Sequence, residues 1–345
     1  MNRSLKHIIL AATLLVCCAA IGSAQTNPFA GSWALSLYGN VSTGSSAGWL
    51  DIRQEDGYLD GDLLWRWGSV EPLASAIMKD GNLVVTWNGN YDRKKDAGGK
   101  VLRSQSLTSW FECEQAGENT FFGTALLPDG KGRNYETIRF IGKRMPPMPA
   151  APDLAKVKFG KPVQLFNGKD LSGWELVVPT DVNGWRIENG VLINDPVQKE
   201  GQPHISYGNL KTKQAFDDFN LKLQVNVPAK SNSGIYLRGK YEVQIVDSYG
   251  KALDTHNMAA VYSRIAPSVS AEKPAGEWQD VDITLCDRHV TILLNGKKII
   301  DNQPVGGVTG GALCPDVTAP GPIYLQGDHG KVLYRNVVLT PIVKQ

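Results

Sequence analysis

The sequence has little cysteine, little net charge and no long apolar run. Five of its 345 residues are cysteine, and 36 Lys and Arg nearly balance 34 Asp and Glu, for a formal net charge of +2. This balance excludes the strongly basic surface of a nucleic-acid-binding protein and an acidic solvating tail. No segment reaches the roughly 20 apolar residues of a membrane-spanning helix. We therefore expect no nucleic-acid partner and no membrane span.

The first 24 residues have the pattern of a signal peptide. Arg3 and Lys6 precede an apolar stretch of 14 residues, Ile8 to Ile21, and small residues up to Ala24 provide a cleavage site. We predict cleavage after residue 24 and a periplasmic or extracellular location. A lipoprotein is the less favoured alternative, because Val16, before the first cysteine of the stretch, is not small.

Three cysteines remain after such cleavage: Cys113, Cys286 and Cys314. An odd number in an exported protein leaves two interpretations open. Either Cys286 and Cys314 form a disulfide and Cys113 is a buried apolar residue, or all three are isolated buried thiols. No Cys/His spacing indicates zinc.

A proline-rich segment divides the chain into two parts. Residues 145–152 carry four prolines in eight positions, and proline lacks an N–H and fixes φ, so the segment is an extended connector. We predict a linker at 145–156, a first domain at 28–144 and a second at 157–345. The two parts share no detectable internal repeat.

The first part is predicted to be a small antiparallel β-barrel or sandwich. Trp33, Leu35 and Leu37 alternate with less apolar residues, and the opening Phe29-x-Gly-x-Trp33 is similar to the first strand of lipocalin-like barrels. Turn signals separate the strand-like runs: Asp56-Gly57, Asp80-Gly81, Asn88-Gly89, Gly98-Gly99 and Asp129-Gly130. Six of the nine tryptophans fall here, and they either fill the barrel and its ends or form a sugar-stacking surface.

The second part is predicted to be a two-sheet jelly-roll sandwich. About ten strand-like runs follow one another without sustained helical periodicity, and Asn189-Gly190 and Asn295-Gly296 are hairpin signals. The fold class is therefore all-β. The chain carries no nucleophile-elbow, P-loop, zinc-protease or dinucleotide-binding motif.

Polar side chains share one face of a predicted hairpin in the second part. Tyr236 and Arg238 alternate with apolar residues on the first strand, as do Glu242 and Gln244 on the second. A loop at 239–241 would place Arg238 opposite Glu242 and Tyr236 opposite Gln244. The alternative is an exposed ion pair on a solvated sheet face.

The segment 323–330 repeats this pattern. Tyr324 and Gln326 face away from Ile323 and Leu325, and Asp328-His329 follow at the strand end. A histidine beside an aspartate at the mouth of a concave sheet is a candidate general acid or base, because its ordinary pKa lies near neutrality.

Several motifs in one order resemble the 3-keto-disaccharide hydrolase domain family over about residues 160–340. They are Leu165-Phe-Asn-Gly-Lys-Asp-Leu-Ser-Gly-Trp174, Gly184-Trp-Arg-Ile-Glu-Asn-Gly-Val191, Asn232-Ser-Gly-Ile-Tyr-Leu-Arg-Gly239, Tyr241-Glu-Val-Gln-Ile245, Lys273-Pro-Ala-Gly-Glu-Trp278, Leu294-Asn-Gly296 and the stretch from Gly321 to Asn336. The resemblance implies a concanavalin-like jelly roll and cleavage of glycosides oxidised to a ketone at C3, by hydrolysis or 1,2-elimination.

Such cleavage needs a base for the C2 proton, a donor at the enolate oxygen and an acid at the leaving oxygen. Glu242 or His329 is the candidate base, and Arg238 the candidate group at the enolate oxygen. Candidate substrate-binding residues are Tyr236, Gln244, Tyr262, Glu277, Trp278 and Gln326. Glu277 and Trp278 would cap the cleft.

Two further questions stay open at this point. A divalent metal is a candidate cofactor, with Asp247, Asp328 and His329 as candidate ligands, although their spacing is not diagnostic. A non-catalytic carbohydrate-binding protein is the alternative function. Convergence of Arg238, Glu242 and His329 on one pocket would favour catalysis over binding. The expected partner is an oxidised sugar or glycoside, and the oligomeric state is left open.

Overall fold

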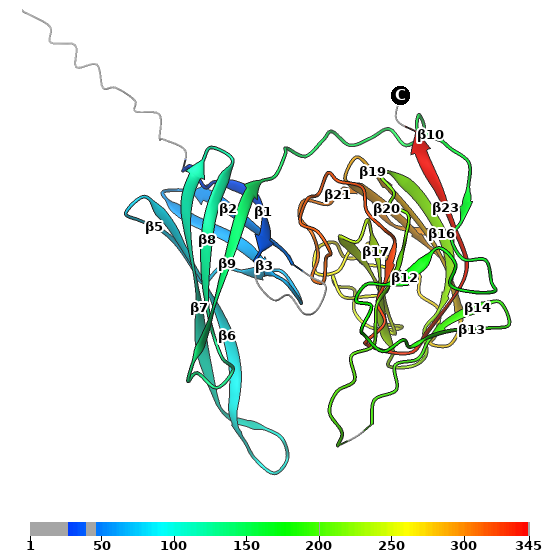
Figure 1. Cartoon of the computed structure of the whole chain (residues 1–345), viewed down its shortest axis with the longest axis horizontal. Helices are drawn as coiled ribbons and strands as arrows, with labels where there is room; N and C mark the ends of the chain where they lie inside the picture. Colours follow the sequence, from blue (N-terminus) through cyan, green and yellow to red (C-terminus); the bar gives the residue numbers. More distant parts are fainter. Residues whose placement is uncertain (1–26, 39–45, 200, 344–345) are drawn as a thin grey trace, which may run out of the picture.

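The computed structural model describes residues 27–38, 46–199 and 201–343, and the predicted signal peptide lies outside these ranges. Every regular element in them is a β-strand, which confirms the all-β prediction. Figure 1 shows the strands gathered into a barrel at one side and a sandwich at the other. Within the described ranges no helix is long and apolar enough to cross a membrane.

The first sheet closes on itself. In the order β2-β1-β9-β8-β7-β6-β5-β3, each strand pairs with the next, and β3 pairs back with β2. Its interior is an apolar cluster around Trp33, Phe111 and Phe121. The strands are β1 (Gly31–Leu37), β2 (Ala47–Glu55), β3 (Tyr58–Trp65), β4 (Glu71–Pro72), β5 (Ser75–Lys79), β6 (Asn82–Lys95), β7 (Val101–Gly117), β8 (Thr120–Pro128) and β9 (Tyr135–Arg144). We call this unit the barrel.

One predicted turn of the barrel is wrong. Asn88-Gly89 lies inside β6, where Gly89 pairs with Leu107 of β7, while the flanking signals Asp80-Gly81 and Gly98-Gly99 do end strands. Asn-Gly predicts a turn only where both residues adopt positive φ, and here the long β6–β7 ladder keeps Gly89 extended. The hairpin projects from the barrel in Figure 1.

The remaining strands form two sheets that pack face to face, which we call the sandwich. One sheet has the order β13-β14-β23-β16-β19-β20-β21, with β10 and β11 on β23, and the other β12-β15-β22-β17-β18. The strands are β10 (Lys158–Phe159), β11 (Val163–Gln164), β12 (Trp174–Leu176), β13 (Trp185–Glu188), β14 (Val191–Asn194), β15 (Leu210–Thr212), β16 (Phe219–Asn226), β17 (Asn232–Leu237), β18 (Tyr241–Val246), β19 (Trp278–Cys286), β20 (His289–Leu294), β21 (Lys297–Pro304), β22 (Tyr324–Leu325) and β23 (Val332–Val343).

Two predicted hairpins of the sandwich are confirmed. Asn189-Gly190 joins β13 to β14 and Asn295-Gly296 joins β20 to β21, and all four residues have positive φ. Asparagine and glycine tolerate this left-handed backbone, which matches the twist of a two-residue hairpin.

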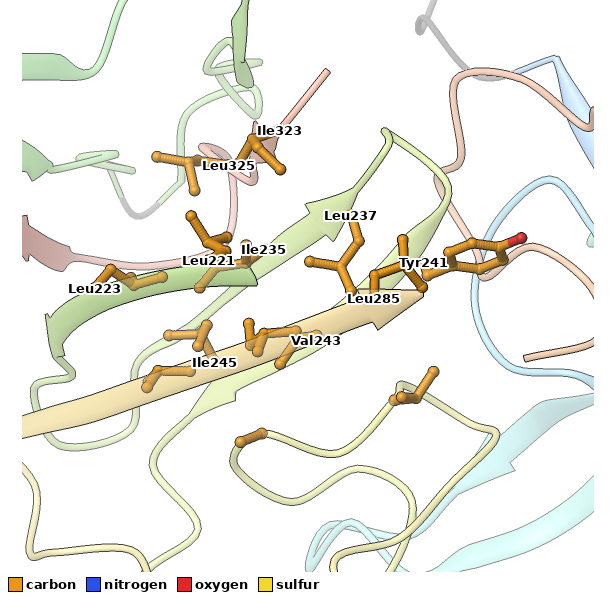
Figure 2. Packing of buried hydrophobic residues seen from close by; sticks show 14 of the residues in the cluster. Leu221, Leu223, Ile235, Leu237, Tyr241, Val243, Ile245, Leu285, Ile323 and Leu325 are labelled. Carbon is orange, nitrogen blue, oxygen red and sulfur yellow. The ribbon is translucent and has the colours of Figure 1, made fainter. Parts of the chain in front are cut away.

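Aliphatic side chains from facing strands fill the space between the two sheets. Figure 2 shows Leu221 and Leu223 of β16 beside residues of β17 and β18 such as Ile235 and Val243. Ile235, Val243 and Ile323 are fully buried. Because these residues point inward, their sequence neighbours on β17, β18 and the strand at 324–325 point to the outer face.

The barrel and the sandwich share a packed seam. Trp49 of β2 is buried and lies beneath the guanidinium of Arg264, 4.1 Å from its ring centroid. The Arg288 guanidinium donates to the carbonyl oxygens of Pro146 and Pro147 in the connector, at 3.0 and 3.2 Å. Trp33, Trp65 and Trp87 belong to the barrel core, whereas Trp110 is exposed.

The three described cysteines form no disulfide bond. Cys113 and Cys286 are buried and Cys314 is partly exposed, so the Cys286–Cys314 disulfide is absent from the structure. Burial among apolar barrel side chains raises the pKa of the Cys113 thiol. The structure therefore matches the alternative without a disulfide, except that Cys314 is not fully buried.

Candidate active site

A cavity of about 430 Å³ opens on the outer face of the five-stranded sheet. This size is typical of small-molecule sites. Its walls come from the sandwich, except for two residues of the barrel. The lining residues are Trp67, Gly68, Asp181, Ser206, Tyr207, Asn209, Asn232, Tyr236, Glu242, Gln244, Tyr262, Gly310, Tyr324, Gln326, Asp328 and His329.

The β17–β18 hairpin supplies the floor, with a register that differs from the predicted one. Tyr236 lies opposite Glu242, and Gly234 opposite Gln244. The turn is Arg238-Gly239-Lys240, because Arg238 already leaves the strand with φ +54°. A register shift of two residues keeps each side chain on its face, so the predicted polar face is confirmed while the Arg238–Glu242 pairing is wrong.

Glu242 is a buried carboxyl group, 4% exposed. Its Oε2 lies 2.8 Å from the hydroxyl of Tyr236, which also contacts the Gly310 carbonyl oxygen at 2.7 Å. Glycine at 234 makes this possible, since a Cβ there would collide with the Glu242 carboxylate. No Lys, Arg or His side chain of the described ranges forms an ion pair with Glu242.

Burial without a cation raises the pKa of Glu242 to about 8, and the Tyr236 hydroxyl partly opposes this rise. Near neutral pH the carboxyl group is therefore mostly protonated. The Tyr236 hydroxyl is the donor in these contacts, to Oε2 of Glu242 or to the Gly310 carbonyl oxygen. The Tyr236 ring stacks on Tyr324 at a centroid distance of 4.2 Å, which fixes its orientation.

His329 lies on the rim of the same cavity, after β22. Partial desolvation lowers its pKa, against the raising effect of the neighbouring Asp328 carboxylate. Asp328 is held in place because its Oδ1 accepts a hydrogen bond of 2.8 Å from the Tyr207 N–H. The cavity thus contains a carboxyl group that prefers to be protonated and an imidazole that prefers to be neutral. Such a divergence separates an acid from a base.

Amide side chains surround these two groups. Asn232, Gln244 and Gln326 line the cavity, and each has a buried side-chain oxygen without a hydrogen-bond partner in the protein. Native proteins seldom leave buried polar atoms unpaired. Three such atoms on one cavity indicate a ligand rich in hydroxyl groups. Tyr262 also lines the cavity, so four of the predicted substrate-binding residues, Tyr236, Gln244, Tyr262 and Gln326, are placed together.

Arg238 is not at the cavity, contrary to the prediction. Its guanidinium points to the other side of the turn, where it pairs with the carboxylates of Asp217 and Asp218 and donates to the Asp217 carbonyl oxygen at 2.7 Å. The positive φ at Arg238 turns the side chain out of the strand's alternation. Its role is to neutralise buried Asp218. No Lys or Arg of the described ranges lines the cavity.

Glu277 and Trp278 do not cap the cavity either. Trp278 begins β19 in the other sheet, and Arg335 covers its ring at 4.0 Å from the centroid. Glu277 is exposed in the preceding turn. Their Pro-Ala-Gly turn is a connection at the opposite sheet, which the sequence pattern could not distinguish from a cleft edge.

The candidate metal ligands are divided by the structure. Asp328 and His329 line the cavity, but Asp247 does not, and its Oδ2 accepts a hydrogen bond from the Lys230 N–H at 2.8 Å. In the described ranges, the group of three potential ligand side chains whose ligand atoms lie within 4.8 Å of one another is Asp218, Cys286 and Asp287, outside the cavity.

Several lining residues were missed from the sequence. Asn232 shares the alternation of Gly234 and Tyr236, so extending the pattern by one step would have found it. Asp181 comes from the segment before β13, Tyr207 and Asn209 come from the segment after β14, and Trp67 comes from the barrel. No local pattern marks these residues, because the sheet pairings of distant segments bring them to the cavity.

A cavity of this size on the outer face of a β-sandwich, lined by a buried carboxyl group, a histidine and unpaired amides, is typical of a carbohydrate-active enzyme. More specifically, the chain belongs to the family of the 3-keto-alpha-glucoside-1,2-lyase-like domain, whose model matches residues 161–340, just over half of the chain. This confirms the resemblance seen in the sequence. No curated protein matches the chain.

Solved structures of three candidate glycosyl hydrolases from Parabacteroides distasonis are similar to this chain. The first is 29% identical, covers 55% of this chain and 92% of its own, and has a TM-score of 0.42. The second is 23% identical with coverages of 53% and 94% and a TM-score of 0.41. The third is 24% identical with coverages of 52% and 98% and a TM-score of 0.39. The family assignment rests on the family model, not on these structures.

Proposed function

We propose that the protein cleaves glycosides oxidised to a ketone at C3 of the sugar, through loss of the C2 proton. The observation that carries the proposal is Glu242, a buried carboxyl group with a raised pKa that lines the same cavity as His329, whose pKa is lowered. The matched family, named for a 3-keto-alpha-glucoside-1,2-lyase, supports this substrate class.

The ketone makes this chemistry accessible. Removal of the C2 proton leaves its electron pair in a C2–C3 enolate, with the negative charge on the C3 oxygen. When the ketone re-forms, a C1–C2 double bond appears and the C1–O bond breaks. The departing oxygen takes a proton from an acid, which completes a 1,2-elimination. Addition of water across the new double bond would give net hydrolysis.

The two pKa shifts suggest which group does what. At neutral pH the imidazole of His329 is free to accept the C2 proton, while protonated Glu242 can donate to the leaving oxygen. Donor N–H groups of Gln244, Gln326 and Asn232 are the candidates for the C3 oxygen, in place of Arg238. The Tyr236 hydroxyl, which contacts both Glu242 Oε2 and the Gly310 carbonyl oxygen, holds the Glu242 carboxyl group in position.

The first test compares a 3-keto-glucoside with its unoxidised parent. Purified protein is incubated with each, with and without chelator, and the released leaving group is measured beside a Glu242→Gln variant. Release from the ketone alone, reduced in the variant, is the expected result. Loss on chelation would add a metal to the mechanism. Sugar binding without release from either compound would replace this proposal with a non-catalytic carbohydrate-binding protein.

A further inference from the structure

The barrel contributes an aromatic side chain to the cavity. Trp67 and Gly68, in the loop between β3 and β4, line it beside the sandwich residues Tyr236 and Gly310. Trp67 lies outside the segment 161–340 that the family model matches. Its side chain is 46% exposed, which is unusual for tryptophan in a folded protein.

The loop that carries Trp67 is fixed against the sandwich at both ends. The Gly311 N–H donates to the Arg66 carbonyl oxygen at 2.7 Å, and the Val70 N–H donates to the Ser263 hydroxyl at 2.9 Å. Between them, the Ser69 hydroxyl lies 3.0 Å from Nε2 of His256. Positive φ angles at Arg66 and Gly68 lift Trp67 to the tip of the loop. The anchored loop therefore holds the indole of Trp67 in a defined position at the cavity.

The loop also contacts Gly310, which is hydrogen-bonded to Tyr236, the residue that contacts Glu242. A Cβ at Gly310 would collide with the backbone of Gly68, so glycine permits the close approach of the two segments. The Gly310 carbonyl in turn accepts the hydrogen bond of Tyr236, the residue that contacts Glu242. A Cβ at Gly311 would lie 2.7 Å from the Tyr236 hydroxyl and 3.2 Å from the Trp67 ring, so these two groups are close to each other. Trp67 thus belongs to the Glu242 side of the cavity.

We infer that Trp67 is the binding platform for the leaving group. This inference rests on the proposed function, in which Glu242 protonates the leaving oxygen. The part of the substrate next to Glu242 that extends toward solvent is then the C1 substituent, and a half-exposed indole at that position offers it a flat apolar face. The ligand class is a ring with a C–H or π face, either a second sugar or an aromatic group. The barrel would thereby select the glycosides that the sandwich cleaves.

The test uses 3-keto-glucosides with methyl, glucosyl and nitrophenyl leaving groups. Trp67→Ala should raise KM about tenfold for the two ring-bearing substrates, with kcat nearly unchanged, and leave the methyl glycoside within about twofold. Trp67→Phe should restore most of the affinity. Trp110→Ala is the control, because that barrel tryptophan is 49% exposed and does not line the cavity. A response to glucosyl but not nitrophenyl, or the reverse, identifies the kind of ring.

A second readout separates this inference from the proposed function. The affinities of the unoxidised glucosides for the wild type and Trp67→Ala are measured by calorimetry, where no bond is broken. Weaker binding of ring-bearing glycosides to the variant supports the platform even if no ketone is cleaved, which would overturn only the proposed chemistry. Equal affinities in both proteins, or an equal KM change for methyl and ring-bearing substrates, would overturn the platform.

Discussion

The barrel and the sandwich are both antiparallel β-structures with apolar interiors, but they bury different polar groups. In the described part of the barrel, the buried polar residues are Thr86 and Ser109, with no charged side chain among them. The sandwich buries Arg238, Lys240 and Glu242 within five residues of one hairpin. Burying ionisable groups costs stability unless they are paired. The sandwich accepts this cost at the hairpin that forms its cavity.

Within that hairpin, Arg238 and Glu242 differ in whether the buried group has an oppositely charged partner. Arg238 has carboxylate partners on its side of the turn, whereas Glu242 faces the cavity with a phenol as its contact. A buried charge with an ionic partner supports the fold, whereas a buried carboxyl group without a cation stays available to a ligand. Substitutions can test this difference directly.

The largest expected effect is on catalysis by Glu242→Gln. With a glucosyl leaving group, kcat should fall about 10²- to 10⁴-fold, because the leaving oxygen loses its proton donor. With nitrophenolate, which leaves without a proton, the fall should be much smaller. Steady-state release of each leaving group gives both numbers.

Two variants accompany this measurement. Glu277→Gln alters an exposed carboxylate of the opposite sheet and should leave both rates unchanged. His329→Asn removes the base and should slow both substrates alike. Equal losses with both leaving groups in Glu242→Gln would instead assign Glu242 as the base.

The second effect is on stability and concerns Arg238→Met. Loss of the guanidinium removes the buried ion pair that Arg238 makes with Asp218, so we expect the free energy of unfolding to fall by about 3–5 kcal/mol. In the barrel, Arg53 also contacts several carboxylates but is 38% exposed, and Arg53→Met should cost at most about 1 kcal/mol. Urea unfolding measures the free energy of unfolding of both variants. Similar decreases in the two would show that the buried and the exposed arginine contribute alike.

The third effect is a pH-dependent stability difference. The folded-state pKa of Glu242, about 8, lies above its ordinary value of 4.5. The folded chain therefore holds this proton more tightly, and its stabilising contribution is full below pH 4.5 and is lost as pH rises to about 8. Glu242→Gln lacks this loss. Its unfolding free energy relative to wild type should rise by a few kcal/mol between pH 4.5 and 8, and a flat difference would contradict the raised pKa.

The smallest effect is a shift of the pH–rate profile in Tyr236→Phe. For a glucosyl leaving group, kcat/KM should fall above pH 8 as Glu242 loses its proton, and fall again at acidic pH as His329 gains one. The Tyr236 hydroxyl lowers the Glu242 pKa, so its removal should move the alkaline limb to higher pH by about one unit. If the alkaline limb of the profile does not move in Tyr236→Phe, a group other than Glu242 controls the fall in kcat/KM at high pH.

Much of the site could be predicted because β-structure has a local period of two. Alternation alone placed Tyr236, Glu242, Gln244 and Gln326 on one face and their apolar neighbours in the core, as the structure confirms. Asn-Gly pairs at 189–190 and 295–296 marked hairpins for the same local reason. The order of motifs over 160–340 identified the family.

Tertiary structure decided what no local pattern contains. The turn conformation at Arg238 set the β17–β18 register and moved its guanidinium to Asp218, and the surrounding sheet removed water from Glu242 and raised its pKa. Trp67 reaches the cavity because a barrel loop docks on Gly310 from more than two hundred residues away in the chain. Alternation is a property of neighbouring residues, so the sequence by itself determined which faces are apolar and polar. Desolvation and docking depend on segments that only the fold brings together.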